Sequence, residues 1–318
     1  MIQLIRKLKK CLYWVFKEYK MYFLYKTNVK FYNYWEVVPE RNWLYRFIKY
    51  QGVQKKINVF SVFGPLWWIK LQQGKKIFFN AENVHSFVFE DLSKYSDNCI
   101  DKVDLSLGFD YIRHDKYIRF PLWLCYFIKP EATYEEIKNK INAINSVSHR
   151  LSSTRNRFAV QISRHDFNGV RKKMIENLNK IEEVSCAGDF MKNTNELQTV
   201  FNDDKLSYLR KFKFNICPEN SSTEGYVTEK IFESIMGGCI PIYWGGGNKQ
   251  SIEADILNSE AFLYYEEGKE NELLSRVYTL WTDKNAYSEF VQTPPFKESA
   301  ADVIWSMLNQ FKKELKRI

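Results

Sequence analysis

Residues 212–247 read FKFNICPENSSTEGYVTEKIFESIMGGCIPIYWGGG, and this stretch decides the fold. A β-prone run is followed by a polar loop, a helical segment, a glycine pair and a second apolar run, which is the order of a strand-helix-strand unit. Gly237 and Gly238 fit the end of the helix, because glycine enters the left-handed conformation at little cost. The stretch therefore predicts an α/β fold with a parallel sheet.

The polar residues of this stretch gather where the first strand ends and the helix begins. In an open parallel sheet, this edge binds ligands. The first helical turn presents unpaired N–H groups and the positive end of the helix dipole, so it favours an anion such as a diphosphate, and Lys230 would add a full charge. A generic α/β repeat, with Glu229 and Lys230 as a solvated helix start, would look much the same. These residue types alone leave both interpretations open.

Several motifs in a fixed order carry more information than any one of them. CPEN, YVTEKI and IPIYWG resemble the signature of glycosyltransferase family 10, the α1,3-fucosyltransferases. The similarity continues upstream through NAEN (80–83), LGFDYI (107–112) and YIRFPLWL (117–124), so it covers most of residues 27–300. The resemblance implies an α/β fold of the GT-B type, in which two Rossmann-like domains face each other across a cleft.

The rest of the chain continues the α/β pattern. Strands are expected at 29–34, 57–63, 77–79 and 103–109, and a helix from about 40 to 50. Pro121 and Pro130 precede a polar segment at 131–157, which we interpret as a linker. Further strands are expected at 157–163, 183–186 and 262–265, and helices at 170–181, 271–281 and 300–316. The predicted parts are a basic segment at 1–26, an N-terminal acceptor domain at 27–150, a C-terminal GDP-fucose domain at 151–300 and a helix at 301–318.

The composition is typical of a folded protein. Of 318 residues, 45% are hydrophobic and 17% are aromatic, which is enough to bury the cores of two domains. The six cysteines are scattered without a C-x-x-C pair, so we expect buried thiols in a reducing compartment. The four histidines are too dispersed for a zinc motif, and no metal site is predicted.

The net charge of +9 is concentrated at the start of the chain. Residues 1–26 hold seven Lys or Arg and one Glu, which gives +6 and leaves +3 for the rest. Apolar residues recur there at helical spacing, but the longest uncharged run is far below the ~20 residues that span a bilayer. A basic amphipathic helix of this kind suits peripheral contact with an anionic membrane, and packing on the protein body is the alternative. The short apolar run and the lack of a small-residue cleavage site exclude a signal peptide.

The resemblance implies an inverting enzyme whose general base is Glu82. This residue follows the apolar run IFF (77–79) and matches the glutamate of the family's G-E-N motif, with Ala81 in place of glycine. A carboxylate at a strand's end could take the proton of an acceptor hydroxyl while the diphosphate departs. From spacing alone, Glu82 would cap the next helix or bind a backbone amide.

The residues implied to bind GDP-fucose lie in the C-terminal domain. Arg171 and Lys230 would bind the diphosphate, because a guanidinium can hold two phosphate oxygens at once. Tyr226 and Glu229 would contact the ribose, the fucose or the phosphate edge, and Asn220 would support the loop. No cofactor is required in this scheme, and stimulation by Mn²⁺ through the diphosphate is left open.

The resulting prediction is an α1,3-fucosyltransferase that moves fucose from GDP-fucose to a GlcNAc hydroxyl of a Gal-GlcNAc-type glycan. Its setting would be the synthesis of bacterial lipopolysaccharide or another surface polysaccharide, in the cytoplasm at the inner face of the membrane. A family member with another acceptor, linkage or GDP-sugar is the nearest alternative. A basic membrane- or nucleic-acid-binding protein without enzymatic activity is the alternative from another class, but the excess charge lies in residues 1–26 and no nucleic-acid motif is present.

Overall fold

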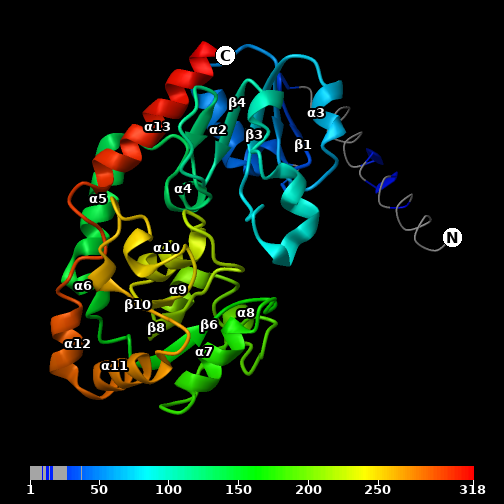
Figure 1. Ribbon diagram of the computed structural model, residues 1–318. Coiled ribbons are helices and arrows are strands. Elements are labelled where there is room, and N and C mark those ends of the chain that lie inside the picture. Colours follow the sequence, from blue (N-terminus) through cyan, green and yellow to red (C-terminus); the bar gives the residue numbers. More distant parts are fainter. Residues whose placement is uncertain (1–8, 10–11, 14, 17–26, 37) are drawn as a thin grey trace. The chain divides into compact units, whose positions relative to one another are not determined.

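The computed structural model describes residues 9, 12–13, 15–16, 27–36 and 38–318. The contacts divide the chain into two units, the first formed by Met1–Ala132 with Ser306–Ile318 and the second by Thr133–Trp305. Each unit holds one five-stranded sheet in which all named strands pair in parallel (Figure 1). The predicted α/β class is therefore confirmed.

The first unit carries its strands in the order of the sequence. These are β1 (Val29–Tyr32), β2 (Ile57–Phe60), β3 (Lys75–Phe79), β4 (Leu105–Gly108) and β5 (Tyr117–Arg119). The first four were predicted, and β5 was not. The helices between them are η1 (Pro39–Arg41), α2 (Trp43–Tyr50), α3 (Trp67–Leu71), η2 (Phe87–Tyr95), η3 (Ile100–Lys102) and α4 (Trp123–Phe127).

One row of apolar residues crosses the centre of this sheet. Phe31 pairs with Val59, Val59 with Ile77, and Ile77 with Leu105, and all four are buried. Central strands of a parallel sheet are covered on both faces, so their side chains are apolar without alternation. This explains why the runs could be recognised in the sequence.

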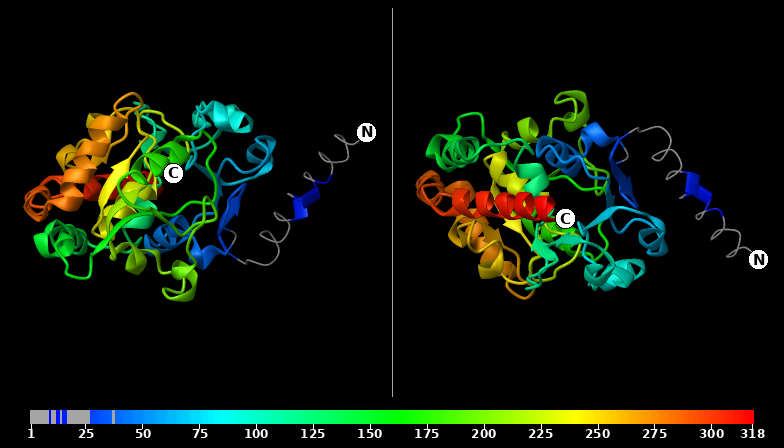
Figure 2. Two further views of the ribbon diagram at one scale, coloured as in Figure 1. Left: turned by 90° about the horizontal axis from the view of Figure 1, so that it is seen from below. Right: turned by 90° about the horizontal axis from the view of Figure 1, so that it is seen from above.

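The second unit has the strand order β10-β9-β8-β6-β7. The strands are β6 (Arg157–Gln161), β7 (Ser185–Cys186), β8 (Phe212–Ile216), β9 (Ile240–Tyr243) and β10 (Leu263–Tyr264). Its longer helices are α7 (Val170–Leu178), α10 (Glu229–Met236), α11 (Glu270–Thr282) and α12 (Lys284–Phe290), and shorter ones are α8 (Glu196–Thr199), α9 (Lys205–Leu209), η4 (Lys249–Ser251) and η5 (Ser259–Ala261). Helices α11 and α12 lie side by side, as the orange segments of Figure 2 show.

The segment predicted as a linker is largely helical. It forms α5 (Tyr134–Asn145) and α6 (Val147–Arg150), both within the second unit. Thr133 accepts a hydrogen bond from the backbone N–H of Glu136, and the Glu136 side chain accepts one from the backbone of Thr133. This capping box starts α5 and corrects the linker prediction. The contacts divide after Ala132, whereas the sequence suggested a boundary after residue 150.

The last helix, α13 (Ala300–Arg317), contributes to both units and is red in Figure 1. Its residues from Ser306 onward belong to the first unit. There, Phe311 stacks on Phe47 with ring centroids 4.9 Å apart and meets Phe120 at 5.2 Å. The core of the first unit is therefore completed by the end of the chain.

The predicted membrane-binding segment, residues 1–26, lies mostly outside the described residues, so its role stays a prediction. None of the helices that the structure describes is both long and apolar enough to cross a membrane. The five described cysteines are free thiols, and all but Cys125 are buried, as expected.

Candidate active site

A buried carboxylate organises the carboxyl edge of the sheet in the second unit. Glu219 lies in the loop after β8 and is 1% exposed. Its Oε1 accepts hydrogen bonds from the backbone N–H of Thr228, at 2.8 Å, and from the hydroxyl of Tyr243, at 3.0 Å. Its Oε2 accepts from the Thr228 hydroxyl at 2.7 Å and from Nζ of Lys230 at 2.9 Å. Four donors thus surround one carboxylate.

This carboxylate also starts helix α10. Thr228 is the N-cap residue, but its side chain does not cap the helix. Glu219 instead holds the N-cap residue itself, because it accepts the N–H of Thr228, and it places a negative charge at the positive end of the helix dipole. Glu219 therefore fixes where the helix begins, and with it the position of Glu229 and Lys230.

Lys230 is held in its charged form. Burial lowers the pKa of Lys230, but the carboxylates of Glu219 and Glu229 outweigh this effect and hold the pKa above its usual value. Its Nζ also donates to the hydroxyl of Thr228 at 2.8 Å and lies 3.6 Å from Glu229. Lys230 is thus a fixed ammonium group at the first turn of α10.

Glu229 and Tyr226 flank this ammonium group along the chain. Burial raises the pKa of Glu229, but Lys230 and Lys205 reverse the effect, so the pKa lies below its ordinary value and the side chain is an anion. Tyr226 lies two residues before the N-cap and is 2% exposed. Both residues belong to the segment that Glu219 holds in place.

Arg171 joins two loops at the same edge. It lies in the first turn of α7, which follows Gly169 in the left-handed conformation at φ 76°. Its Nη2 donates to Oδ1 of Asn220 at 2.7 Å and to the carbonyl of Pro218 at 3.3 Å, and its Nη1 donates to the carbonyl of His165. The structure therefore brings Arg171 and Asn220 together, as the sequence predicted for one shared site.

A small cavity of about 20 Å³ lies between these groups and carries positive charge. Arg171, Lys205 and Lys230 line it, together with Gln161 and Asn215 at the carboxyl ends of β6 and β8. Lys205 pairs with Glu233 and was not predicted to belong to the site. The cavity has room for about one water molecule, but its three cations, two of which are paired with carboxylates, lie close together at this edge of the sheet.

Glu82 belongs to the first unit and lies three residues beyond the end of β3. Its backbone N–H donates to Oδ1 of Asn80 at 3.3 Å, and the residue is half-buried. Ala81 does not need glycine's conformational freedom, because its φ is not positive. The substitution of alanine for the family's glycine is therefore compatible with the local backbone.

A chain of buried polar groups stands behind the Glu82 loop. Nδ2 of Asn80 donates to Oδ1 of Asn98 at 2.8 Å, and Nδ2 of Asn98 donates to Asp110 at 2.6 Å. Asp110 also lies 3.0 Å from Nε2 of His85. Both asparagines are fully buried. The loop from residue 80 to residue 85 is therefore tied to β4 and to the segment after it.

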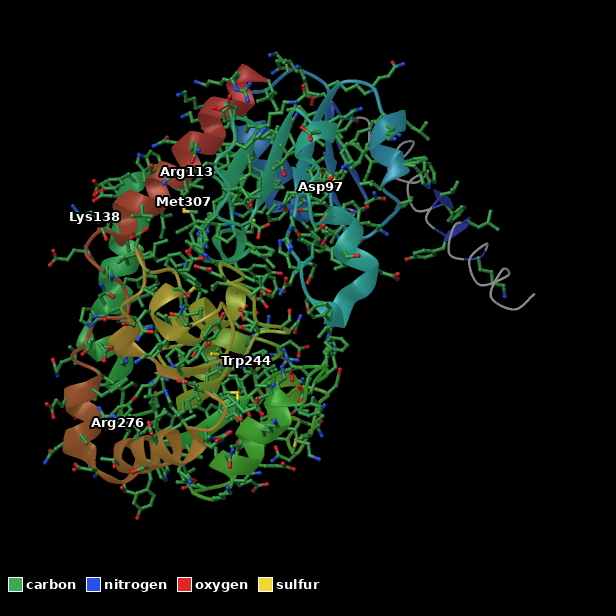
Figure 3. All side chains as sticks on the ribbon, viewed as in Figure 1. Asp97, Arg113, Lys138, Trp244, Arg276 and Met307 are labelled. Atoms are coloured by element: carbon green, nitrogen blue, oxygen red, sulfur yellow. The ribbon has the colours of Figure 1, made fainter. Side chains whose placement is uncertain are left out.

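Among the residues that the structure describes, no group of three or more His, Cys, Asp or Glu could hold a metal ion. A larger cavity, of about 700 Å³, lies beside the loop after β9. Trp244 and Arg276, which Figure 3 labels, are among the residues that line it. Acidic and basic residues both line it. They are Glu266, Glu267, Glu272, Lys249, Lys269 and Arg276.

Two family models match the chain. The model described as glycosyltransferase family 10 (fucosyltransferase) C-term matches residues 151–303, and the model of the α-(1,3)-fucosyltransferase FucT N-terminal domain matches residues 29–126. α-(1,3)-Fucosyltransferase FucT of Helicobacter pylori is 27% identical in an alignment 274 residues long, which covers 78% of this chain and 52% of that protein. The chain therefore spans about half the length of this curated relative.

Solved structures show the same fold. A crystal structure of an α1,3-fucosyltransferase superposes with a TM-score of 0.59 at 22% identity and covers 90% of this chain and 89% of its own. A structure of α1,3-fucosyltransferase with GDP-fucose gives a TM-score of 0.53 at 24% identity, covering 81% and 77%. The two parallel sheets therefore form a GT-B fold.

Proposed function

Because the chain belongs to glycosyltransferase family 10, we propose that it is an α1,3-fucosyltransferase that takes fucose from GDP-fucose. The observation that carries this proposal is the arrangement around Glu219, which holds Lys230 as an ammonium group at the start of α10, beside Arg171. The H. pylori relative and the structure with GDP-fucose support the choice of donor.

Arg171 and Lys230 bind the diphosphate in this proposal. Three N–H groups of Arg171 are engaged within the described part of the chain, and a guanidinium has five, so donors remain for phosphate oxygens. Tyr226 and Glu229 contact the ribose or the fucose, and Asn220 orients Arg171. Lys230→Ala should weaken GDP-fucose binding, and unchanged affinity would refute the diphosphate role.

Glu82 acts as the general base in this proposal. The acceptor hydroxyl gives its proton to Glu82 while its oxygen forms a bond to C1 of fucose. The bond from C1 to the diphosphate oxygen breaks on the opposite face, GDP leaves, and the configuration at C1 inverts. The negative charge that develops on the diphosphate is stabilised by Arg171 and Lys230. No step needs a protein-bound metal, and Mn²⁺ would act only on the diphosphate.

The acceptor in this proposal is a Gal-GlcNAc-type glycan of a bacterial lipopolysaccharide or another surface polysaccharide. The support is the bacterial relative, which is an α1,3-fucosyltransferase. The first unit would bind this acceptor and the second unit the donor. Residues 1–26 would place the enzyme on the inner face of the membrane, and their deletion should release it from anionic vesicles without loss of turnover on a soluble acceptor.

The experiment that tests the proposal uses the purified full chain with GDP-fucose and N-acetyllactosamine. GDP release and a fucosylated product in the mass spectrum are expected, and nuclear magnetic resonance of the product gives the linkage. The assay is repeated with a chelator and with Mn²⁺. If GDP-fucose binds but no product forms, the proposed donor is retained and the proposed acceptor is wrong. If GDP-fucose does not bind, the proposed function is wrong.

A further inference from the structure

A third cavity in the second unit lies at the opposite edge of the sheet from the candidate active site. Its volume is about 590 Å³. Arg155 lies two residues before β6, and Lys213 is the second residue of β8. The cavity is therefore at the amino ends of these parallel strands. The carboxyl ends of the same strands carry Arg171 and Lys230 through their following loops. The two places are therefore separated by the length of the strands.

The charged side chains that line this cavity are all basic. They are Arg150, Arg155, Lys213 and Lys284. None of these four forms an ion pair with a carboxylate in the described part of the chain. The cavity of about 700 Å³ beside β9 differs, since acidic and basic residues alternate there. A cavity lined by one sign of charge concentrates ions of the other sign.

The two arginines are buried without a counterion. Arg155 is 5% exposed and Arg150 is 2% exposed. Arg155 donates to the carbonyls of Leu209 and Gly237, at the ends of α9 and α10, and Arg150 donates to the carbonyl of Thr293. Carbonyls at helix ends carry partial negative charge, which explains why the guanidinium ends are tolerated. The Nε atoms of both arginines have no hydrogen-bond acceptor in the described structure.

Nζ of Lys213 also donates to a helix-end carbonyl, that of Trp281 in the last turn of α11, at 3.5 Å. Nζ of Lys213 lies 4.4 Å from the ring centre of Tyr287 and 4.9 Å from that of Trp281. Burial and the nearby charge of Lys284 lower the pKa of Lys213. The rings of Tyr287 and Trp281 thus contact the ammonium group of Lys213, and the charge of Lys284 lies nearby. An anion between the two ammonium groups would relieve the repulsion that this arrangement creates.

We propose that this cavity binds a phosphate-bearing ligand at a site distinct from the active site. The ammonium groups of Lys213 and Lys284 line it beside the two buried arginines, so a group with two negative charges, such as a phosphate monoester or a diphosphate, fits the charge better than a neutral sugar. Ser152, Ser153 and Ser288 add hydroxyl groups that can donate to phosphate oxygens. The ligand is either a soluble phosphate compound or the phosphate of a lipid headgroup. This inference does not depend on the proposed activity.

Hydrogen exchange of the full chain with inorganic pyrophosphate tests the site. Pyrophosphate should protect the amides of residues 150–157 and 281–288, and this protection should persist in Lys230→Ala, which removes a diphosphate contact of the active site. The affinity at the cavity should fall about tenfold in each of Lys213→Met and Lys284→Met, because each removes a charged hydrogen-bond donor. Lys192→Met removes a charge elsewhere in the unit that is exposed, as that of Lys284 is, and should change nothing.

Vesicles distinguish the two sources of the phosphate. The double variant K213M/K284M is compared with the wild type in sedimentation with phosphatidylglycerol and phosphatidylcholine vesicles. If the variant loses pyrophosphate protection but sediments as the wild type does, the ligand is a soluble phosphate compound. If it sediments less with phosphatidylglycerol and pyrophosphate displaces the wild type, the ligand is a lipid headgroup. Wild-type affinity for pyrophosphate in the double variant, or no protection of these segments by pyrophosphate or vesicles, would overturn the proposal. Lys213→Arg, which keeps the charge, should bind as the wild type.

Discussion

The two sheets hold their candidate site residues by different means. Behind the Glu82 loop, two buried asparagines form a neutral hydrogen bond, Asn80 to Asn98, at 2.8 Å. In the second unit, a buried ion pair joins Glu219 to Lys230 at 2.9 Å. The support behind the Glu82 loop runs through amide groups and ends on the carboxylate of Asp110. A charged support fixes the ammonium form, as a phosphate-binding residue requires.

The largest effect is expected from removing the base. Glu82→Gln keeps the shape of the side chain but cannot accept a proton, so turnover should fall about 100- to 10,000-fold. GDP-fucose affinity, measured by calorimetry, should stay at the wild-type value, because the donor residues lie in the other unit. Full activity in this variant would show that Glu82 is not the base. The two networks would then not differ in the chemical roles of the residues that they hold.

The next largest effect is expected from the charged support. Glu219→Gln takes the nearest carboxylate from the partly buried Lys230, which keeps Glu229 at 3.6 Å, and should cost about 2 to 3 kcal/mol of unfolding free energy. Urea unfolding measures the loss, and GDP-fucose affinity should fall in the same variant. The control is Glu267→Gln, since Glu267 pairs with Lys173 at an exposed position and should contribute below about 1 kcal/mol. Equal losses in the two variants would contradict the central role of Glu219.

A smaller effect is expected from the neutral support. Asn98→Ala leaves Asn80 and Asp110 each without one buried partner and should cost about 2 kcal/mol. Turnover should fall while GDP-fucose affinity does not. Asn98 has φ 50°, so Asn202→Ala, at an exposed residue with φ 49°, is the control for the backbone cost alone. If the control loses as much as Asn98→Ala, the hydrogen bonds of Asn98 do not support the loop.

The smallest effect is expected in the pH dependence. The pKa of Glu229 in the folded protein lies below its ordinary value of 4.5, so its contribution to stability is present above pH 4.5 and is lost as the pH falls through the folded pKa. Unfolding free energy measured in steps below pH 5 should decline less in Glu229→Gln than in the wild type. Asn202→Ala should keep the wild-type slope, because it changes only an exposed amide. Parallel slopes for all three proteins would show that Glu229 does not titrate as described.

The sequence predicts the strands well because the buried strands are continuous apolar runs. β5 was missed because Lys116 and Arg119 leave only two consecutive apolar residues in its segment. The helix α5 was missed because Glu135, Lys138 and other charged residues make its segment polar. The pair Thr133 and Glu136, with the spacing of a capping box, could have indicated it.

The candidate site was predictable only in part. The motif YVTEK identifies the helix start at Glu229 and Lys230, and the resemblance adds Arg171 and Asn220, which the structure joins by a hydrogen bond. The role of Glu219 could not be predicted, because its donors come from Thr228, Lys230 and Tyr243, which lie 9, 11 and 24 residues away in the chain. Only the parallel pairing of β8 with β9 brings them together.

The end of helix α13 has a consequence for synthesis on the ribosome. Phe47 and Phe120 are made early, but Phe311, on which they pack, emerges only after the whole of the second unit. The second unit, Thr133–Trp305, is continuous and needs no later segment for its core. Domains generally fold as units during translation. The unit that is synthesised first is therefore the one that finishes folding last, and its aromatic residues await their partner while the other unit is already complete.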